Sequence, residues 1–203
     1  MISRRALLGS SAAAAAKLFA ASADSRTPSP ELEKLGAVAL REAKRLKAGY
    51  CDIRIVRYRS QSVAVRLSPE RGTGKTLEVP NLADTNSFGF GVRVIVQGAW
   101  GFAASPVVTA EEIARITREA VTVARANAQL ASRAVVLAPV KAYRDRWQSP
   151  CEKNPFAVPL REKLDLLREA ARVVKEDKRV FGASALLRLR SEDKYFASSE
   201  GSS

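Results

Sequence analysis

Histidine is absent from this chain of 203 residues. Zinc enzymes nearly always use histidine ligands, and acid–base catalysis at neutral pH most often uses the imidazole ring. A Ser-His-Asp or Cys-His catalytic arrangement is therefore excluded. We expect this polypeptide to have no catalytic residue and no metal ligand set of its own, and to be inactive when it is alone.

Cysteine is scarce, with only Cys51 and Cys151 in the sequence. Their spacing matches no metal-binding motif. In an exported protein the two thiols could form a disulfide, which would close a long loop worth about 4 kcal/mol. A protein that folds before export would need no such bridge, so the sequence leaves the pairing open.

An uninterrupted apolar run is also missing. The apolar segment ALLGSSAAAAAKLFAA is short and contains Lys17, so it does not predict a membrane span. It follows the basic start MISRR and ends at Ala21-Ser22-Ala23, an A-x-A cleavage pattern, so residues 1–23 are expected to be a secretory signal peptide with cleavage at Ala21 and Ala23. A mitochondrial presequence and a frayed helix are the alternatives.

Arg4 and Arg5 stand directly before the apolar residues Leu7 and Leu8. This arrangement is similar to a twin-arginine signal, which exports proteins after they have folded. We therefore expect a periplasmic protein with no membrane span after signal removal. Residues 24–30, DSRTPSP, are expected to form a linker.

Acidic residues are too few to balance the basic ones, and the formal net charge is +13. Removing the expected signal would lower this excess by only three charges. The basic residues are scattered, without a block of five or more, which is typical of a solvated surface. A nucleic-acid-binding module without enzymatic activity stays as the alternative function.

A nucleotide-binding loop is only partly present. GTGKT at 72–76 resembles the end of a P-loop, but the first glycine that the motif requires is replaced by Pro69. The sequence LEVP that follows is not helical. We expect a flexible surface loop here rather than a phosphate site.

Helix signals occur in three places. Ser29-Pro30 begins an apolar stripe that runs to Gly49, Thr109 and Glu112 form a capping box, and Pro159 precedes a third stripe. Helices are expected near 30–48, 109–130 and 160–177. Alternating residues predict a hairpin over 51–67, a polar loop over 68–87, a short strand at 135–139 and a strand over 180–190 that turns at 192–194.

The stretch GFGVRVIVQGAWGFAAS at 89–105 predicts a hairpin that turns at Gln97-Gly98. Ile95 should then oppose Trp100, Arg93 should oppose Phe102, and Gly91 should oppose Ala104. Glycines on the aromatic face would leave room for flat rings or for another backbone. The surface is therefore either aromatic packing against a helix, or a peptide groove or hinge formed by Gly89, Gly91, Gly98, Trp100, Gly101 and Phe102.

Several segments together resemble the amino-terminal domain of the TldD/PmbA family. They are GFGVRVIVQGAWGFAAS with the helix TAEEIARITREAVTVARA behind it, AGYCDIRI at 48–55, REKLDLLREAARVV at 161–174, and FASSEGSS at 196–203. Gln97 stands where the family usually has aspartate. The resemblance covers residues 31–203 and implies an amino-terminal domain cut off before the catalytic part.

Because hairpins rather than βαβ crossovers dominate the sequence, we expect an α+β fold, in which about three long helices cover one face of a curved, mostly antiparallel sheet of hairpins. The family contains zinc metallopeptidases and their non-catalytic partner subunits, which form homodimers or heterodimers and act on unfolded peptides. Its zinc-binding H-E-x-x-x-H helix would follow the last serine of this chain, so no metal or catalytic residue carries over. The family's association with DNA gyrase modulation is a further reason to keep the nucleic-acid alternative.

Overall fold

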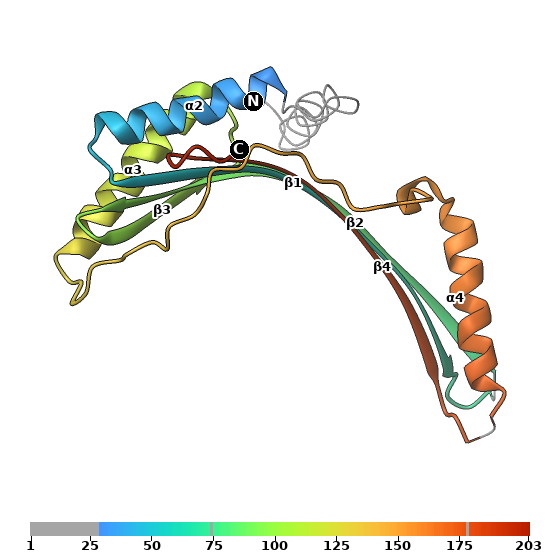
Figure 1. Ribbon diagram of the computed structural model, residues 1–203. Coiled ribbons are helices and arrows are strands. Elements are labelled where there is room, and N and C mark those ends of the chain that lie inside the picture. The colour runs from blue at the N-terminus through green and yellow to red at the C-terminus, as the bar shows by residue number, and fades with distance from the viewer. Residues whose placement is uncertain (1–28, 74, 178) are drawn as a thin grey trace, which may run out of the picture. The chain divides into compact units, whose positions relative to one another are not determined.

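The computed structural model describes residues 29–73, 75–177 and 179–203 (Figure 1). The expected signal peptide and nearly all of the expected linker lie outside these ranges. The described elements, in chain order, are α2 (Pro30–Arg45), β1 (Tyr50–Pro69), β2 (Thr76–Val96), β3 (Ala99–Ser105), α3 (Ala110–Ala128), the 3-10 helix η1 (Pro155–Ala157), α4 (Leu160–Lys175) and β4 (Ala183–Ser198).

The strands form one antiparallel sheet in the order β3-β2-β1-β4. Together with the three α-helices this confirms the expected α+β class. No helix in the described ranges is long and apolar enough to cross a membrane.

The chain divides into two compact units. Among the described residues, the first unit contains 29–57, 87–148 and 192–203, and the second contains 58–86 and 149–191. Strands β1, β2 and β4 therefore contribute residues to both units, whereas α2, β3 and α3 belong to the first and α4 belongs to the second.

The core of the first unit lies between the sheet and the helices α2 and α3. Alternate residues of each strand point into it, as expected for a sheet with one covered face. The members from the strands include Cys51, Ile53 and Ile55 of β1 and Phe90, Val92, Val94 and Val96 of β2; those from α3 include Ile113, Ile116, Ala120, Val121 and Ala124.

A smaller core holds α4 in the second unit. It consists of Val63, Val65, Leu67, Leu167, Ala171 and Ala183. Beside it, the buried Lys163 donates a hydrogen bond from Nζ to Oε1 of Gln61 at 2.6 Å, and Nε2 of Gln61 donates to Asp84 at 2.8 Å. This chain of hydrogen bonds gives the buried amine and amide partners.

The hairpin of β2 and β3 has the predicted register. Ile95 pairs with Trp100, Arg93 with Phe102, and Gly91 with Ala104. Gln97 and Gly98 both have positive φ, 50° and 75°, which are the signs of a type I′ turn. A two-residue turn of this type matches the twist of the flanking strands, so the local sequence was sufficient to predict the pairing.

Four sequence-based expectations about strands are wrong. Residues 51–67 belong to one continuous strand rather than a hairpin, β2 already begins at Thr76 inside the expected polar loop, β4 continues through 192–194, and 135–139 is not a strand. The polar middle of β1 does not turn because its side chains find partners: Arg57 pairs with Asp193, and Arg59 and Gln61 with Asp84.

The helix ends agree only in part with their predicted signals. The hydroxyl of Thr109 accepts a hydrogen bond from the Glu112 amide at 3.2 Å, as the capping box predicts. Ser29 occupies the expected cap position of α2 but makes no capping hydrogen bond with its side chain. Helix α2 stops at Arg45, and Lys47 rather than Gly49 takes the left-handed conformation, with φ 60°.

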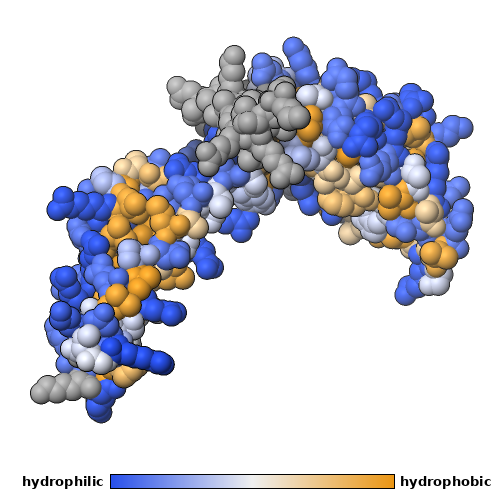
Figure 2. Space-filling view, turned by 180° about the vertical axis from the view of Figure 1, so that it is seen from behind, coloured by the Kyte–Doolittle hydropathy of each residue, from blue (hydrophilic) through white to orange (hydrophobic). Residues whose placement is uncertain are grey.

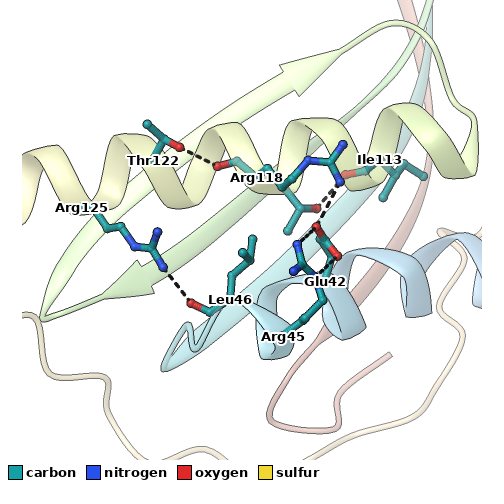
Figure 3. A network of polar contacts seen from close by, with 8 residues as sticks. Glu42, Arg45, Leu46, Ile113, Arg118, Thr122 and Arg125 are labelled. Carbon is teal, nitrogen blue, oxygen red and sulfur yellow. Dashed lines mark hydrogen bonds and ion pairs between the residues drawn. The ribbon is translucent and has the colours of Figure 1, made fainter.

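Polar side chains join α2 to α3 along their exposed edge (Figure 3). The carboxylate of Glu42 accepts from Arg45 on its own helix at 2.8 Å and from Arg118 of α3 at 3.1 Å. Further along the same edge, Arg125 of α3 donates to the carbonyl oxygen of Leu46 at 3.1 Å. The hydrogen bonds to Arg45 and Arg118 lower the pKa of Glu42 from 4.5 to about 2, against the opposing effect of burial.

Candidate functional site

The face of the first unit's sheet that points away from α2 and α3 carries a cluster of aromatic and charged side chains. Because side chains alternate along a strand, the residues between the core positions point to this face. They include Tyr50 and Asp52 on β1, Arg93 on β2, and Trp100 on β3. We call these four residues the outer cluster.

An ion pair holds the outer cluster together. Asp52 is only 1% exposed, and its Oδ2 accepts from Nη2 of Arg93 at 2.7 Å and from Nε at 2.9 Å. This two-point contact supplies the partner that a buried carboxylate requires. Hydrogen bonding to Asp52 is the main reason why the pKa of Arg93 is raised.

Trp100 packs against Arg93 of this ion pair and against the ring of Tyr50. The guanidinium carbon of Arg93 is 5.3 Å from the centre of the indole, and the ring of Tyr50 meets it edge-on at 5.7 Å and 88°. Burial raises the pKa of Tyr50 to about 12, and the nearby Asp52 adds to the effect. The cluster is therefore a packed layer in which the Asp52 carboxylate and the Arg93 guanidinium already bind each other.

Phe102 lies next to Trp100 along β3 and is 58% exposed. Its ring covers Gly91, where an added Cβ would come within 2.8 Å of Cε2. The expectation that glycine lets an aromatic ring lie flat is met at this position. Phe102 thus presents one free apolar face beside the outer cluster.

The other glycines of the predicted groove have different neighbours. A Cβ on Gly101 would collide with the α3 backbone at Ala120 and Ala124, so this glycine allows the helix to approach the strand. Gly98 provides the turn and lies against Ala134, and Gly89 lies against the carbonyl oxygen of Ser105. Of the six predicted groove residues, Gly89, Gly91, Trp100 and Phe102 alternate onto the outer face, and of these Phe102 contacts Gly91.

Strand β3 is an edge strand, and its register fixes which backbone groups face outward. In a two-residue hairpin the flanking residues Val96 and Ala99 exchange hydrogen bonds, and every second pair does the same. The N–H and C=O groups of Trp100, Phe102 and Ala104 therefore point away from β2. The carbonyl oxygen of Trp100 accepts from Nδ2 of Asn127 at 2.8 Å, which leaves Phe102 and Ala104 nearest to the open part of the edge.

Four residues around the surface were not selected from the sequence, namely Tyr50, Asp52, Arg54 and Phe196. The guanidinium carbon of Arg54 lies 5.5 Å from the ring centre of Phe196 on β4. The alternation of Tyr50, Asp52 and Arg54 with core residues was a usable signal, because an acid within an apolar strand needs a cation nearby.

The described residues do not form a zinc site. Within them, no three carboxylate or thiol groups lie close enough together to hold a metal ion, and the sequence has no histidine. Cys51 is buried and Cys151 exposed, and both are free. Burial raises the pKa of the Cys51 thiol to about 12, whereas a zinc ligand must be a thiolate.

The described residues of the GTGKT segment, 72–73 and 75–76, do not match a phosphate-binding loop. Gly72 and Thr73 belong to a turn between β1 and β2, and a strand follows from Thr76 where a P-loop requires a helix. The hydroxyl of Thr73 donates to the carboxylate of Glu70 at 2.6 Å, which places negative charge beside the turn. The expected surface loop is thus a short strand connection.

Comparisons with known proteins point to one family. Residues 78–124, which include most of β2, all of β3 and most of α3, match PmbA/TldA metallopeptidase domain 1. A metalloprotease of Methanocaldococcus jannaschii is 28% identical over 138 residues, which are 66% of this chain and 28% of that protein.

Solved structures share the fold. A candidate modulator of DNA gyrase from Bacteroides thetaiotaomicron superimposes with a TM-score of 0.59 at 16% identity, over 85% of this chain and 37% of its own. A corresponding protein of Thermotoga maritima gives 0.55 at 16% identity, over 83% and 35%. TldE of Thermococcus kodakarensis gives 0.50 at 16% identity, over 84% and 35%.

The chain therefore spans about a third of the length of these relatives. It has their fold over most of its own length, and its β2–β3–α3 segment is similar to the first domain of the PmbA/TldA metallopeptidases.

Proposed function

We propose that this chain is the amino-terminal domain of a TldD/PmbA-type protein, and that it acts as a non-catalytic scaffold beside the path of an unfolded peptide substrate. The zinc and the catalytic residues of such an assembly would come from residues outside this sequence. A catalytic protein and a non-catalytic partner subunit are both compatible with this role. A second subunit of the same family is the partner that we propose.

The observation that carries the peptide-facing role is the combination of Phe102 and the β3 edge. Phe102 is exposed beside the outer cluster, and the neighbouring backbone groups point away from the sheet. An extended peptide recognised by strand addition needs both backbone hydrogen bonds and an apolar contact. This surface offers both within one strand.

Fluorescence can test peptide binding, because Trp100 and Trp147 are the only tryptophans. In a Trp147→Phe background, adding an unfolded, reduced and alkylated casein fragment should change Trp100 emission in a saturable way. Phe102→Ala should weaken the binding at least fivefold. Phe181→Ala, which removes a phenylalanine that is 81% exposed in the second unit, should leave it unchanged.

A titration without saturable change, or an equal loss in both phenylalanine variants, would reject the peptide-facing surface. Circular dichroism of each variant checks that the fold is intact. Added chelator should not affect the binding, because the proposal places no metal in this chain.

The nucleic-acid alternative gains no support from the arrangement of the arginines. Arginines on several elements already bind carboxylates, including Arg57, Arg59, Arg93, Arg118 and Arg168. Those guanidinium groups would have to exchange a carboxylate for a phosphate. Binding of single-stranded DNA that falls steeply between 50 and 200 mM salt would favour the alternative.

We also propose that residues 1–23 export the protein to the periplasm through the twin-arginine pathway. Fusing residues 1–30 to a reporter that must fold in the cytoplasm should yield periplasmic reporter. Replacing both Arg4 and Arg5 with lysine should keep it in the cytoplasm, whereas replacing Lys17 alone should not. Export that persists in the double-lysine variant would contradict this route.

A further inference from the structure

The first unit contains a pocket that the proposed function does not use. It has a volume of about 540 Å³ and lies between α2 and the end of β4 with the residues that follow it. All of its lining residues belong to the first unit. The volume lies within the range of known small-molecule sites, which is about 300–1,000 Å³.

Small apolar side chains line the inner part of this pocket. They are Ala37, Leu40 and Ala43 of α2, Ala48, and Ala197 of β4. Ala43 is 1% exposed and Ala197 is 5% exposed, so the wall beneath the pocket is continuous with the core. Tyr195 adds an aromatic ring, and its position is fixed by contact with Gly36, where a Cβ would come within 2.8 Å of the ring.

Positive charge gathers around the same pocket. Arg41 and Lys44 of α2 and Arg144 of the segment after α3 line it, with Glu33 as the one carboxylate side chain. Among the described residues no ion pair or side-chain hydrogen bond joins these three cations to a carboxylate. This differs from Arg45, Arg57, Arg93, Arg115 and Arg118 of the same unit, each of which binds an acid.

Three cations that bind no carboxylate of the described residues, together with an apolar wall, suit a ligand that has an anionic head and an apolar body. We propose that this pocket binds a small monocarboxylate with a short apolar chain, with its head near Arg41, Lys44 and Arg144 and its body along Ala37, Leu40 and Ala197. Glu33 at the same site disfavours a doubly charged head such as a phosphate monoester. A medium-chain fatty acid and the carboxyl-terminal residue of a peptide share this chemistry.

Calorimetry with matched charged and neutral probes tests the pocket. The probes are octanoate against octanamide, and acetyl-Leu-Leu with a free carboxylate against its carboxamide. At least one carboxylate should bind at a single saturable site, and its amide should bind at least tenfold more weakly. Binding of octanoate alone would identify a fatty acid as the ligand, and binding of the dipeptide alone would identify a peptide end.

Two variants and a matched control assign the binding to this site. Arg144→Gln should weaken the carboxylate at least tenfold, and Ala37→Leu should weaken it by filling the pocket without changing the charge. Lys141→Gln removes one positive charge from the same segment at a residue that does not line the pocket, so the affinity should stay within twofold.

The proposal is wrong if neither carboxylate gives saturable heat, if the amides bind equally well, or if Lys141→Gln weakens binding as much as Arg144→Gln. Circular dichroism of each variant confirms that it is folded. Because the outer cluster takes no part, peptide binding reported by Trp100 should be unchanged in Arg144→Gln, and the two proposals can therefore fail independently.

Discussion

Gly101 matters because it has no side chain. It lies on β3 directly under α3, where a Cβ would meet the carbonyl oxygen of Ala120, the amide nitrogen of Ala124 at 2.6 Å and the Cβ of Ala124 at 2.8 Å. Two of these atoms are backbone, so they cannot move without displacing the helix. The sequence placed Gly101 in a possible peptide groove or hinge, and in the structure it allows close packing of α3 on β3.

Gly101→Ala should therefore lower the free energy of unfolding by about 2 kcal/mol, as overpacking of a core does. Gly91→Ala is the first control, because there the Cβ meets the exposed ring of Phe102, which can rotate away. Gly49→Ala is the second, since its Cβ meets only the Ile95 carbonyl oxygen at 3.7 Å. In urea titrations the free energy of unfolding should fall most for Gly101→Ala, less for Gly91→Ala and least for Gly49→Ala. Equal losses for Gly101→Ala and Gly49→Ala would contradict the packing argument.

The two cysteines should differ sharply in reactivity. Cys51 is 1% exposed and its thiol pKa is raised to about 12, whereas Cys151 is exposed. A disulfide-exchange reagent at pH 8 should modify one thiol per native chain quickly and the second only in denaturant, because the thiolate is the reacting form. Cys151→Ser should abolish the fast phase, and Cys51→Ala should leave it intact.

At the scale of elements, Glu42 links α2 to α3 through Arg118, whereas the one ion pair of Glu119 with another described residue is with Arg115 inside α3. Glu42→Gln should lower the free energy of unfolding by about 1 kcal/mol at pH 7, which is near the upper end for partly exposed ion pairs. Glu119→Gln should cost less, because one helix keeps its own packing without that pair.

The pH dependence gives a second test of Glu42. Its folded-state pKa of about 2 is below the ordinary 4.5, so its contribution to stability is complete above pH 4.5 and is lost as the pH falls toward 2. The Glu42→Gln variant should lose less stability than the parent over this interval. If the stability of the two proteins fell equally with pH over this interval, the lowered pKa would not belong to Glu42.

Elements with local signals were predicted well, and elements that depend on distant partners were not. The β2–β3 hairpin and the start of α3 follow from a turn, an alternation and a cap within a few residues. The middle of β1 was interpreted as a turn because Arg59, Ser60 and Gln61 are polar, yet Asp84 on the neighbouring strand pairs with two of them. The sequence does not state which distant carboxylate will lie opposite.

Pro80 lies within β2, in the segment that was predicted to be a polar loop. Proline cannot donate to a neighbouring strand, which argues against a central strand. However, β3 pairs only with 90–96, so β2 has no partner on that side near Pro80 and behaves there as an edge. The outer cluster was missed in the same way, because Asp52 and Arg93 meet only after β1 and β2 have paired.

At the scale of the whole molecule, exposed apolar side chains are unevenly distributed. Figure 2 shows apolar surface in the part of the chain that carries α4, where Leu166, Val173 and Val174 are each more than half exposed. Single exposed apolar residues are normal on a solvated surface, whereas a contiguous patch of them is typical of an interaction site. It is a surface that the proposed subunit partner could cover.

The long connection from α3 to η1 should be the first site of proteolysis. Among the described residues, backbone hydrogen bonds attach it to Gly98 through Val135 and to Ser203 through Tyr143 and Asp145, but none involves 136–141. Limited trypsin digestion should therefore cut after Lys141 before it cuts in any helix or strand. Lys141→Gln should slow the first cut, and an initial cut inside α3 or α4 would contradict this expectation.

Strand β1 contributes side chains to two separate cores, and all of them come from odd-numbered positions. They are Cys51, Ile53 and Ile55 in one core, and Val63, Val65 and Leu67 in the other. Deleting a single residue near Ser60 would keep one of these sets in place and turn the other to the opposite side of the ribbon. A change of two residues would keep both sets on their original side, whereas a change of one would need a β-bulge to restore the second set.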